Sequence, residues 1–274
     1  MSRVTFKADG PGYDASTAIA CARVARLAYG SESGVRRLGV RHGLSLVWHK
    51  TAGSHFGLAL ANTEAIFVAF RGTNEWRDWL TNLNIVVGYS PLGGVHGGFL
   101  RAANLFLGPQ QDGLLSALRR SQSGRTIWVT GHSLGGAIAL LLAAHLEVVE
   151  GIHVAGVYTF GQPAVGSLAF RRHLSKKFPG AIFRFINSID AVSDLPGLYI
   201  SPRPLFLHGL THVGNVRYFS ADGRVYSRKP WVVNVIDQVR AVSKWGGFAS
   251  LSVHAMKQYI RQLDAPPNRT TEST

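Results

Sequence analysis

The sequence contains one cysteine, so no disulfide bond can form within the chain. Acidic residues are also few, 15 against 29 Lys and Arg, which gives a formal net charge of +14. No apolar run reaches the roughly 18 uncharged residues that a membrane-spanning helix needs, so we expect no transmembrane segment. The hydrophobic share of 46% is typical of a globular chain and argues against intrinsic disorder.

These absences narrow the classes of partner and cofactor. The basic residues are scattered and no recognised nucleic-acid motif occurs, so we expect no nucleic-acid partner. Attraction to an anionic membrane and plain solvated charge both remain open as explanations of the positive charge. No His, Cys and carboxylate cluster has metal-ligand spacing, so we expect neither a metal nor an organic cofactor. Cys21 lies at helical spacing and is expected to be a small buried hydrophobe.

The chain is expected to form a single domain over residues 1–265, followed by a disordered tail at 266–274. No internal repeat and no linker divides it. The first residues lack the apolar core of a signal peptide, which leaves the compartment open between the cytoplasm and a mature secreted form. The sequence does not predict the oligomeric state.

Strands and helices alternate along the middle of the chain, which indicates an α/β fold with a mostly parallel central sheet flanked by helices. Apolar alternation predicts strands at 56–62, 65–73, 126–130, 153–163 and 181–188, and a hairpin at 216–227. Helical periodicity predicts helices at 13–30, 98–120 with an interruption at Gly108 and Pro109, 134–150, 167–178, 232–244 and 248–263. Residues 89–99 read as a glycine-rich loop.

Ser133 lies between a β-branched strand and a long apolar helix, in the frame G-H-S-L-G. This frame is typical of a nucleophile elbow, a turn so sharp that side chains two residues either side of the serine would collide. Gly131 and Gly135 remove those side chains. The free N–H groups of the following helix favour an oxyanion, with Leu134 N–H as the expected donor.

A serine nucleophile needs a base and an acid that orients the base. Among the acids after Ser133, Asp190 directly follows a predicted strand and is favoured over the more loop-like Asp194. The histidines that follow Asp190 are His208, His212 and His254. His208 and His212 share a loop, and the residues alone do not choose between them. For His254, in the last predicted helix, a packing or surface role is expected.

With these residues identified, the chain resembles the class 3 lipase family, the α/β-hydrolases of fungal triacylglycerol lipases and their bacterial and plant relatives. The matching segments run in family order over about residues 60 to 215. They are VAFRGT at 68–73, DWLTNL at 78–83, VHGGF at 95–99, VTGHSLGGA at 129–137, YTFGQPAVG at 158–166, NSIDAVSDLP at 187–196 and HVG at 212–214.

The resemblance implies an α/β-hydrolase fold with Ser133 as nucleophile, Asp190 as triad acid and His212 as base. It also implies Thr73 as a second oxyanion donor beside Leu134. His96 matches a family position whose role looks structural, so a packed, hydrogen-bonded histidine is expected there. The chain departs from the fungal enzymes in its short interval between Asp190 and His212 and in lacking their disulfides, so long-acyl specificity does not transfer.

The segment after FRGT, residues 74–84, resembles the family's short helical lid. Its apolar side chains fall on one helical stripe that could also bind an acyl chain, namely Trp76, Trp79, Leu80 and Leu83. An ordinary half-buried helix is the alternative.

The expected reaction is the hydrolysis of carboxylic esters of lipids at an oil–water or membrane interface, through an acyl-enzyme. A phospholipase A or other polar-lipid acyl hydrolase at anionic membranes is the alternative, and a non-catalytic descendant of the fold is a third reading. The sequence gives neither the acyl chain length nor the positional preference.

Overall fold

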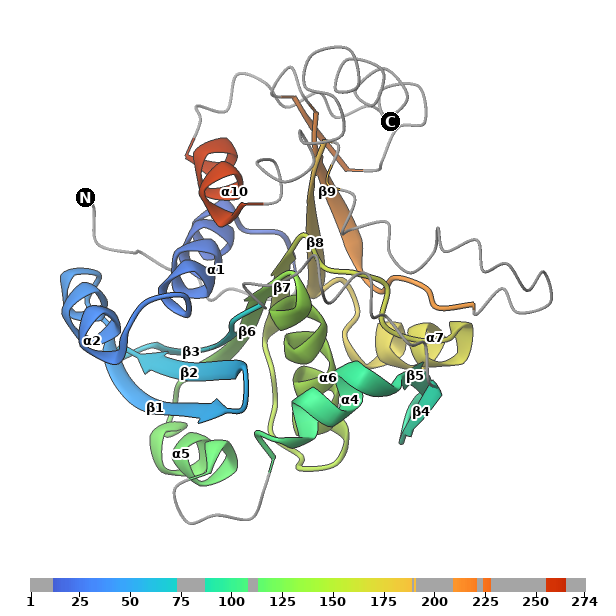
Figure 1. The fold of residues 1–274 in the computed structure, drawn as a ribbon, viewed down its shortest axis with the longest axis horizontal. Coiled ribbons are helices and arrows are strands. Elements are labelled where there is room, and N and C mark those ends of the chain that lie inside the picture. Colours follow the sequence, from blue (N-terminus) through green and yellow to red (C-terminus); the bar gives the residue numbers. More distant parts are fainter. Residues whose placement is uncertain are drawn as a thin grey trace.

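The computed structural model describes residues 12–72, 87–107, 113–188, 190, 209–220, 224–227 and 255–264. Its centre is an eight-stranded sheet in the order β1-β2-β3-β6-β7-β8-β9-β10 (Figure 1). The strands are β1 Ser45–Ala52, β2 His55–Ala61, β3 Ala65–Phe70, β6 Thr126–His132, β7 Gly156–Phe160, β8 Ile182–Asn187, β9 Asn215–Phe219 and β10 Val225–Tyr226. Strands β3, β6, β7, β8 and β9 are parallel, whereas β1, β2 and β10 join antiparallel at the two sides.

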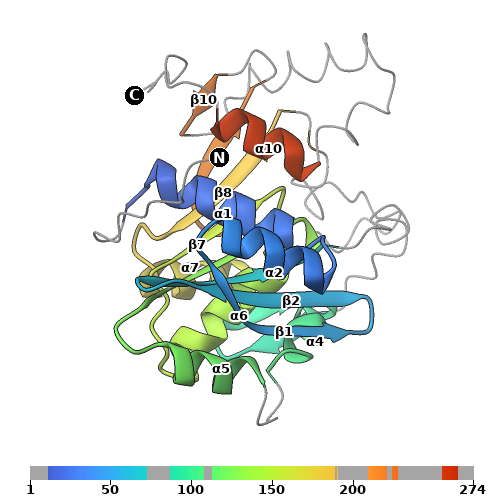
Figure 2. The same ribbon diagram turned by 90° about the vertical axis from the view of Figure 1, so that its left-hand side faces the viewer.

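Helices cover both faces of the sheet (Figure 2). The described helices are α1 Ala15–Leu27, α2 Glu32–Arg41, α4 Gly97–Asn104, α5 Leu114–Ser121, α6 Leu134–Val148, α7 Leu168–Lys177 and α10 Met256–Leu263. Apolar residues of α4, α5, α6 and α7 form one hydrophobic cluster with the sheet, and those of α1, α2 and α10 form a second. The chain is therefore a three-layer α/β sandwich with a core on each side of its sheet.

This architecture confirms the predicted class, a mostly parallel sheet flanked by helices. The prediction of a loop at residues 89–99 is wrong, because Val87–Ser90 and Gly93–His96 pair as the antiparallel hairpin β4-β5. The glycine-rich sequence of this hairpin lacks the apolar alternation by which strands are recognised, although its backbone groups pair as in any antiparallel hairpin. Helix α2 and strand β1 were not predicted. Helix α2 is largely exposed and buries only Val35 and Gly39, and β1 is mostly half-buried, so neither has a strong apolar pattern.

Several predicted features lie outside the described residues: the helix at 232–244, the turn at Asp222–Gly223, the segment 74–84 and the tail at 266–274. None of the described helices combines the length and the apolar character needed to cross a bilayer.

Candidate active site

Ser133 occupies a strained backbone position at the carboxyl end of the parallel sheet. It follows the last residue of β6 and directly precedes α6, with φ 58° and ψ −130°, a conformation that non-glycine residues rarely adopt. Its N–H donates to Phe160 O at 2.9 Å, which fixes the turn to the end of β7. The side chain is 2% exposed, and its Oγ has no hydrogen-bond partner among the described residues. A buried, unpartnered hydroxyl on a strained turn is available for chemistry.

The two glycines that frame Ser133 are required by close backbone contacts. A Cβ on Gly131 would lie 2.2 Å from the carbonyl oxygen of Gly135. A Cβ on Gly135 would lie 2.1 Å from Phe70 O, at the end of β3. The expected reason for these glycines is therefore confirmed, since no side chain fits at either position.

The turn after β3 packs directly against the nucleophile. A Cβ on Gly72 would lie 3.0 Å from Ser133 Cβ and 2.7 Å from the carbonyl oxygen of His132. Gly72 N–H donates to Tyr29 Oη at 3.2 Å, and that hydroxyl lies 2.7 Å from His132 Nδ1. Burial raises the pKa of Tyr29, so its neutral hydroxyl can accept from Gly72 and donate to His132. Tyr29 thus ties the two turns together, a role that no pattern in the sequence signals.

The predicted oxyanion donors are the N–H groups of Leu134 and Thr73. Leu134 is the first residue of α6, and the first N–H groups of a helix have no intrahelical acceptor. Its role as an oxyanion donor stays a prediction. Thr73 lies outside the described residues, although Gly72, which directly precedes it, packs against Ser133.

Asp190 also reaches the carboxyl end of the sheet. It follows the end of β8, its N–H donates to Asn187 O at 2.8 Å, and it is 1% exposed. The hydroxyl of Tyr259, on α10, donates to Asp190 Oδ2 at 2.5 Å. The strand before Ser133 and the strand before Asp190 are separated only by β7, so both residues lie at the same sheet edge. Asp194, the alternative acid, lies outside the described residues.

His212 precedes β9, and the strand register puts it towards the other end of the sheet. Strand β9 runs parallel to β8, and its first residue, Asn215, lies opposite Phe183 near the beginning of β8. His212 comes before that residue, whereas Asp190 comes after the end of β8. Strand β9 alone spans about 13 Å at ~3.3 Å per residue. The histidine and the acid are therefore at opposite ends of neighbouring strands.

The contacts of the residues around His212 agree with this register. Thr211 pairs with Gly166, just before α7. A Cβ on Gly214 would lie 2.7 Å from the carbonyl oxygen of Ile182, the first residue of β8. The structure thus brings Ser133 and Asp190 to one edge and does not bring His212 there. The other two histidines considered, His208 and His254, lie outside the described residues, as do the predicted lid and acyl-binding residues Trp76, Trp79, Leu80 and Leu83.

His96 is packed and hydrogen-bonded, as expected. It caps α4 by accepting from Phe99 N–H at Nδ1, at 3.4 Å, and its ring stacks on the Phe99 ring at 4.1 Å. Burial, with a contribution from the positive charge of Arg101, lowers the pKa of His96 to about 4. The ring is therefore neutral at pH 7.

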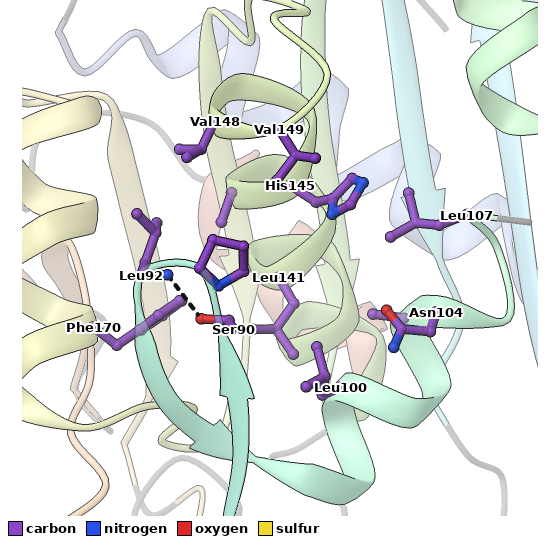
Figure 3. Close-up of a pocket in the computed structure, with 13 residues that line it drawn as sticks. Ser90, Leu92, Leu100, Asn104, Leu107, Leu141, His145, Val148, Val149 and Phe170 are labelled. Atoms are coloured by element: carbon purple, nitrogen blue, oxygen red, sulfur yellow. Dashed lines mark hydrogen bonds between the residues drawn. The ribbon is translucent and has the colours of Figure 1, made fainter.

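A separate apolar pocket lies along the distal half of α6, between α4 and the β4-β5 hairpin (Figure 3). Leu141, Val148 and Val149 line it from α6, and Leu100 lines it from α4. Leu141 is seven residues beyond the start of α6, about 10 Å along the helix axis. The pocket is thus remote from Ser133. No group of three or more His, Cys, Asp or Glu side chains in the described part of the chain could hold a metal ion.

Residues 67–200 match the sequence profile of the family described as lipase (class 3). A relative named lipase, from Rhizomucor miehei, is 37% identical over 143 residues, which cover 48% of this chain and 38% of the relative. The secreted mono- and diacylglycerol lipase 1 of Fusarium solani is 34% identical, over 50% and 41% of the two chains. The chloroplastic phospholipase A(1) DAD1 of Arabidopsis thaliana is 31% identical, over 50% and 35%. The chain thus spans only about two fifths of the length of these curated relatives.

Solved structures share the fold over most of the chain. Lipase II from Rhizopus niveus superposes with a TM-score of 0.62 at 22% identity, over 74% of this chain and 80% of that one. A triacylglycerol lipase whose structure is described as having a serine protease triad as its catalytic centre superposes with a TM-score of 0.60 at 25% identity, over 74% and 79%. The fold of this chain is therefore the α/β-hydrolase fold.

Proposed function

Because residues 67–200 match the profile of the class 3 lipases and the fold is that of solved lipases, we propose that this chain hydrolyses carboxylic ester bonds of lipids through an acyl-enzyme on Ser133. The observation that carries the proposal is the strained elbow at the start of α6, where the Ser133 hydroxyl is buried and has no hydrogen-bond partner within the described part of the chain. The helix N-terminus beside it suits the oxyanion that forms when a serine attacks an ester carbonyl.

Asp190 is proposed as the triad acid. Asp190 is buried at the same sheet edge as Ser133. Its backbone N–H donates to Asn187 O, and its carboxylate accepts at Oδ2 from the Tyr259 hydroxyl. In this role it would orient the imidazole of the base and stabilise the imidazolium that forms on proton transfer.

For the base we propose His254 rather than His212, which the strand register separates from Asp190. His254 directly precedes Ala255, the N-cap of α10, and its own placement lies outside the described residues. Helix α10 carries Tyr259, whose hydroxyl bonds Asp190. The bond between Tyr259 and Asp190 brings the segment that directly follows His254 against the proposed triad acid, which supports His254 as the base.

The chain's residues would then act in two steps. In the first, the histidine takes the Ser133 proton while Oγ attacks the ester carbonyl, and the alcohol leaves with that proton. The oxyanion is held by Leu134 N–H and, by proposal, by Thr73. In the second step, water activated by the same histidine attacks the acyl-enzyme and releases the acid, which restores the Ser133 hydroxyl.

The proposed substrates are neutral-lipid or other carboxylic esters presented at an interface, with residues 74–84 acting as a lid. The relatives named as a lipase and as a mono- and diacylglycerol lipase support this substrate class. The stripe of Trp76, Trp79, Leu80 and Leu83 supports an apolar lid surface.

A phospholipase A activity is the second candidate, and two observations favour it. Two relatives are named phospholipases A1, from Arabidopsis thaliana and Serratia liquefaciens. The net charge of +14 suits an anionic membrane surface. Release of fatty acid from triacylglycerol emulsions and from phosphatidylglycerol vesicles, measured on one preparation, separates the two candidates.

The proposal is tested by p-nitrophenyl esters of increasing chain length, with Ser133→Ala as the dead control. Loss of a triad member costs about 10⁴-fold or more in kcat, so Ser133→Ala should keep less than about 1% of activity. Asp190→Asn and His254→Ala should each lose activity to a similar order. His212→Ala and His208→Ala should keep most of theirs. An inactive His212→Ala beside an active His254→Ala would reverse the choice of base, and an active Ser133→Ala would remove the proposed site.

A further inference from the structure

We propose that Tyr259 is a positioning residue for the proposed triad acid, delivered to it by the C-terminal helix α10. The inference rests on the proposed function and deepens it, because it assigns to this chain's α10 a part in the reaction. Tyr259 lies beyond residues 67–200, the segment that matches the family profile.

The hydroxyl of Tyr259 makes two hydrogen bonds that together fix the end of β8. It donates to Asp190 Oδ2 at 2.5 Å and accepts from Asn187 N–H at 3.2 Å. Asp190 N–H in turn donates to Asn187 O at 2.8 Å. One phenol therefore holds both the carboxylate and the last residue of the strand that presents it.

The ring of Tyr259 is held as firmly as its hydroxyl. It is 0% exposed and meets three rings edge-on or tilted, those of Phe160 at 5.8 Å, His132 at 6.1 Å and Phe219 at 6.4 Å. His132 directly precedes Ser133, so the ring of Tyr259 contacts the residue before the proposed nucleophile while its hydroxyl bonds the proposed acid. A ring confined on several sides leaves its hydroxyl little freedom to point elsewhere.

Helix α10 is itself fastened to the rest of the domain. Its buried side chains, Met256 and Tyr259, join the core on the α1 side of the sheet. At its far end, Asp264 pairs with Arg23 of α1 at 3.2 Å. Helix α10 is therefore packed against the core on the same side of the sheet as α1.

The hydrogen bond from Tyr259 has two expected effects on Asp190: it orients the carboxylate, and it stabilises the ionised form. A carboxylate has two oxygens, and a donor on Oδ2 favours the orientation in which Oδ1 is the oxygen proposed to face the base. A hydrogen bond to the ionised form also stabilises the charge of a carboxylate that is almost wholly removed from water. Without that donor, the carboxylate would be less firmly oriented and would draw the proton of the base more strongly.

The test compares Tyr259→Phe with Tyr158→Phe, a matched control. Tyr158 is also fully buried, and its hydroxyl bonds backbone groups of Gly12 and Asp14 rather than the proposed site. On a soluble short-chain p-nitrophenyl ester, Tyr259→Phe should lower kcat about tenfold, the scale of one lost charged hydrogen bond, with little change in KM. Tyr158→Phe should leave both constants close to wild type.

The pH profile separates positioning from packing. In Tyr259→Phe the acid limb of kcat/KM should move to higher pH by about 0.5 unit, because the base then faces a carboxylate that holds protons more strongly. Replacement of Tyr259 by 3-fluorotyrosine keeps the ring and makes the hydroxyl a stronger donor. That substitution should move the acid limb the opposite way, and it preserves a readout if Tyr259→Phe folds poorly.

An unchanged kcat and an unchanged acid limb in both Tyr259 variants would overturn the positioning role. So would a loss in Tyr259→Phe that equals the loss in Tyr158→Phe and follows their melting temperatures, since that pattern is purely structural. The Ser133→Ala enzyme distinguishes this failure from failure of the proposed function. If Ser133→Ala is inactive and Tyr259→Phe is like wild type, only the role of Tyr259 falls. An active Ser133→Ala overturns both.

Discussion

Single residues at the elbow decide whether the proposed nucleophile can exist at all. Ser133 adopts its strained conformation only because Gly131 and Gly135 bring three backbone segments into contact. The strain at Ser133 is therefore supported by neighbouring β3 and α6. A functional constraint of this kind is visible in the sequence as glycines at fixed offsets, which is why it could be predicted.

Gly135→Ala tests this close contact. Its Cβ would meet Phe70 O at 2.1 Å, so the chain has to shift α6 away from β3. We expect a destabilisation of about 3 kcal/mol or more, the upper range for overpacking. Gly136→Ala is the control, because its Cβ would meet Gln162 Cβ at 3.1 Å and the carbonyl oxygen of Gly131 at 3.2 Å, contacts that shifts of a few tenths of an ångström relieve. Urea unfolding of the two variants measures the difference, and equal midpoints would show that the elbow is not tightly packed.

The lowered pKa of His96 should make the free energy of unfolding depend on pH. Burial lowers its folded-state pKa to about 4, against about 6.5 unfolded, so the unfolded chain binds the proton first as pH falls. The stability that neutral His96 contributes is present above about pH 6.5 and is lost between about pH 6.5 and 4, by up to about 3 kcal/mol. His96→Asn keeps a capping acceptor without the titration. Unfolding free energies of the two proteins should converge over that range, and parallel pH curves would contradict the assignment.

Helices and strands with long or regularly spaced apolar residues could be predicted from the sequence, whereas those with few apolar residues could not. Helix α6 is mostly apolar and strand β6 is almost wholly buried, so their apolar runs could be recognised in the sequence. Strand β1 and the β4-β5 hairpin form through backbone pairing and edge position, which leave little apolar signature. The contact of α10 with Asp190 joins residues 69 positions apart and is set by tertiary packing alone. For that reason no catalytic or positioning role could be predicted for His254 or Tyr259 from the sequence.

The proposed lid is tested at its apolar stripe. Burying a large aromatic side chain at an interface contributes roughly 1.5–3 kcal/mol, so two tryptophans can shift a lid equilibrium of a few kcal/mol. Trp76→Ser combined with Trp79→Ser should lower activity on emulsified long-chain esters far more than on dissolved short-chain esters. Equal losses on both substrates would show that residues 74–84 form an ordinary structural segment.

At the scale of the whole molecule, the charge of +14 should govern approach to a lipid surface. The protein should bind vesicles with anionic lipid more tightly than zwitterionic vesicles, and binding should weaken as salt rises, because screening shortens to about 8 Å at physiological ionic strength. Co-sedimentation at several salt concentrations measures this effect. Binding that ignores both lipid charge and salt would make the positive charge irrelevant to substrate approach.

The central claim is that Ser133 is an activated nucleophile in an α/β-hydrolase, and covalent capture tests it most directly. A fluorophosphonate should react with the folded protein at one site, and mass spectrometry of the digested protein should find the adduct on Ser133. Labelling should stop in Ser133→Ala and should slow strongly in Asp190→Asn, whose neutral amide cannot support the imidazolium. An adduct on another residue, or undiminished labelling of Ser133→Ala, would contradict the account.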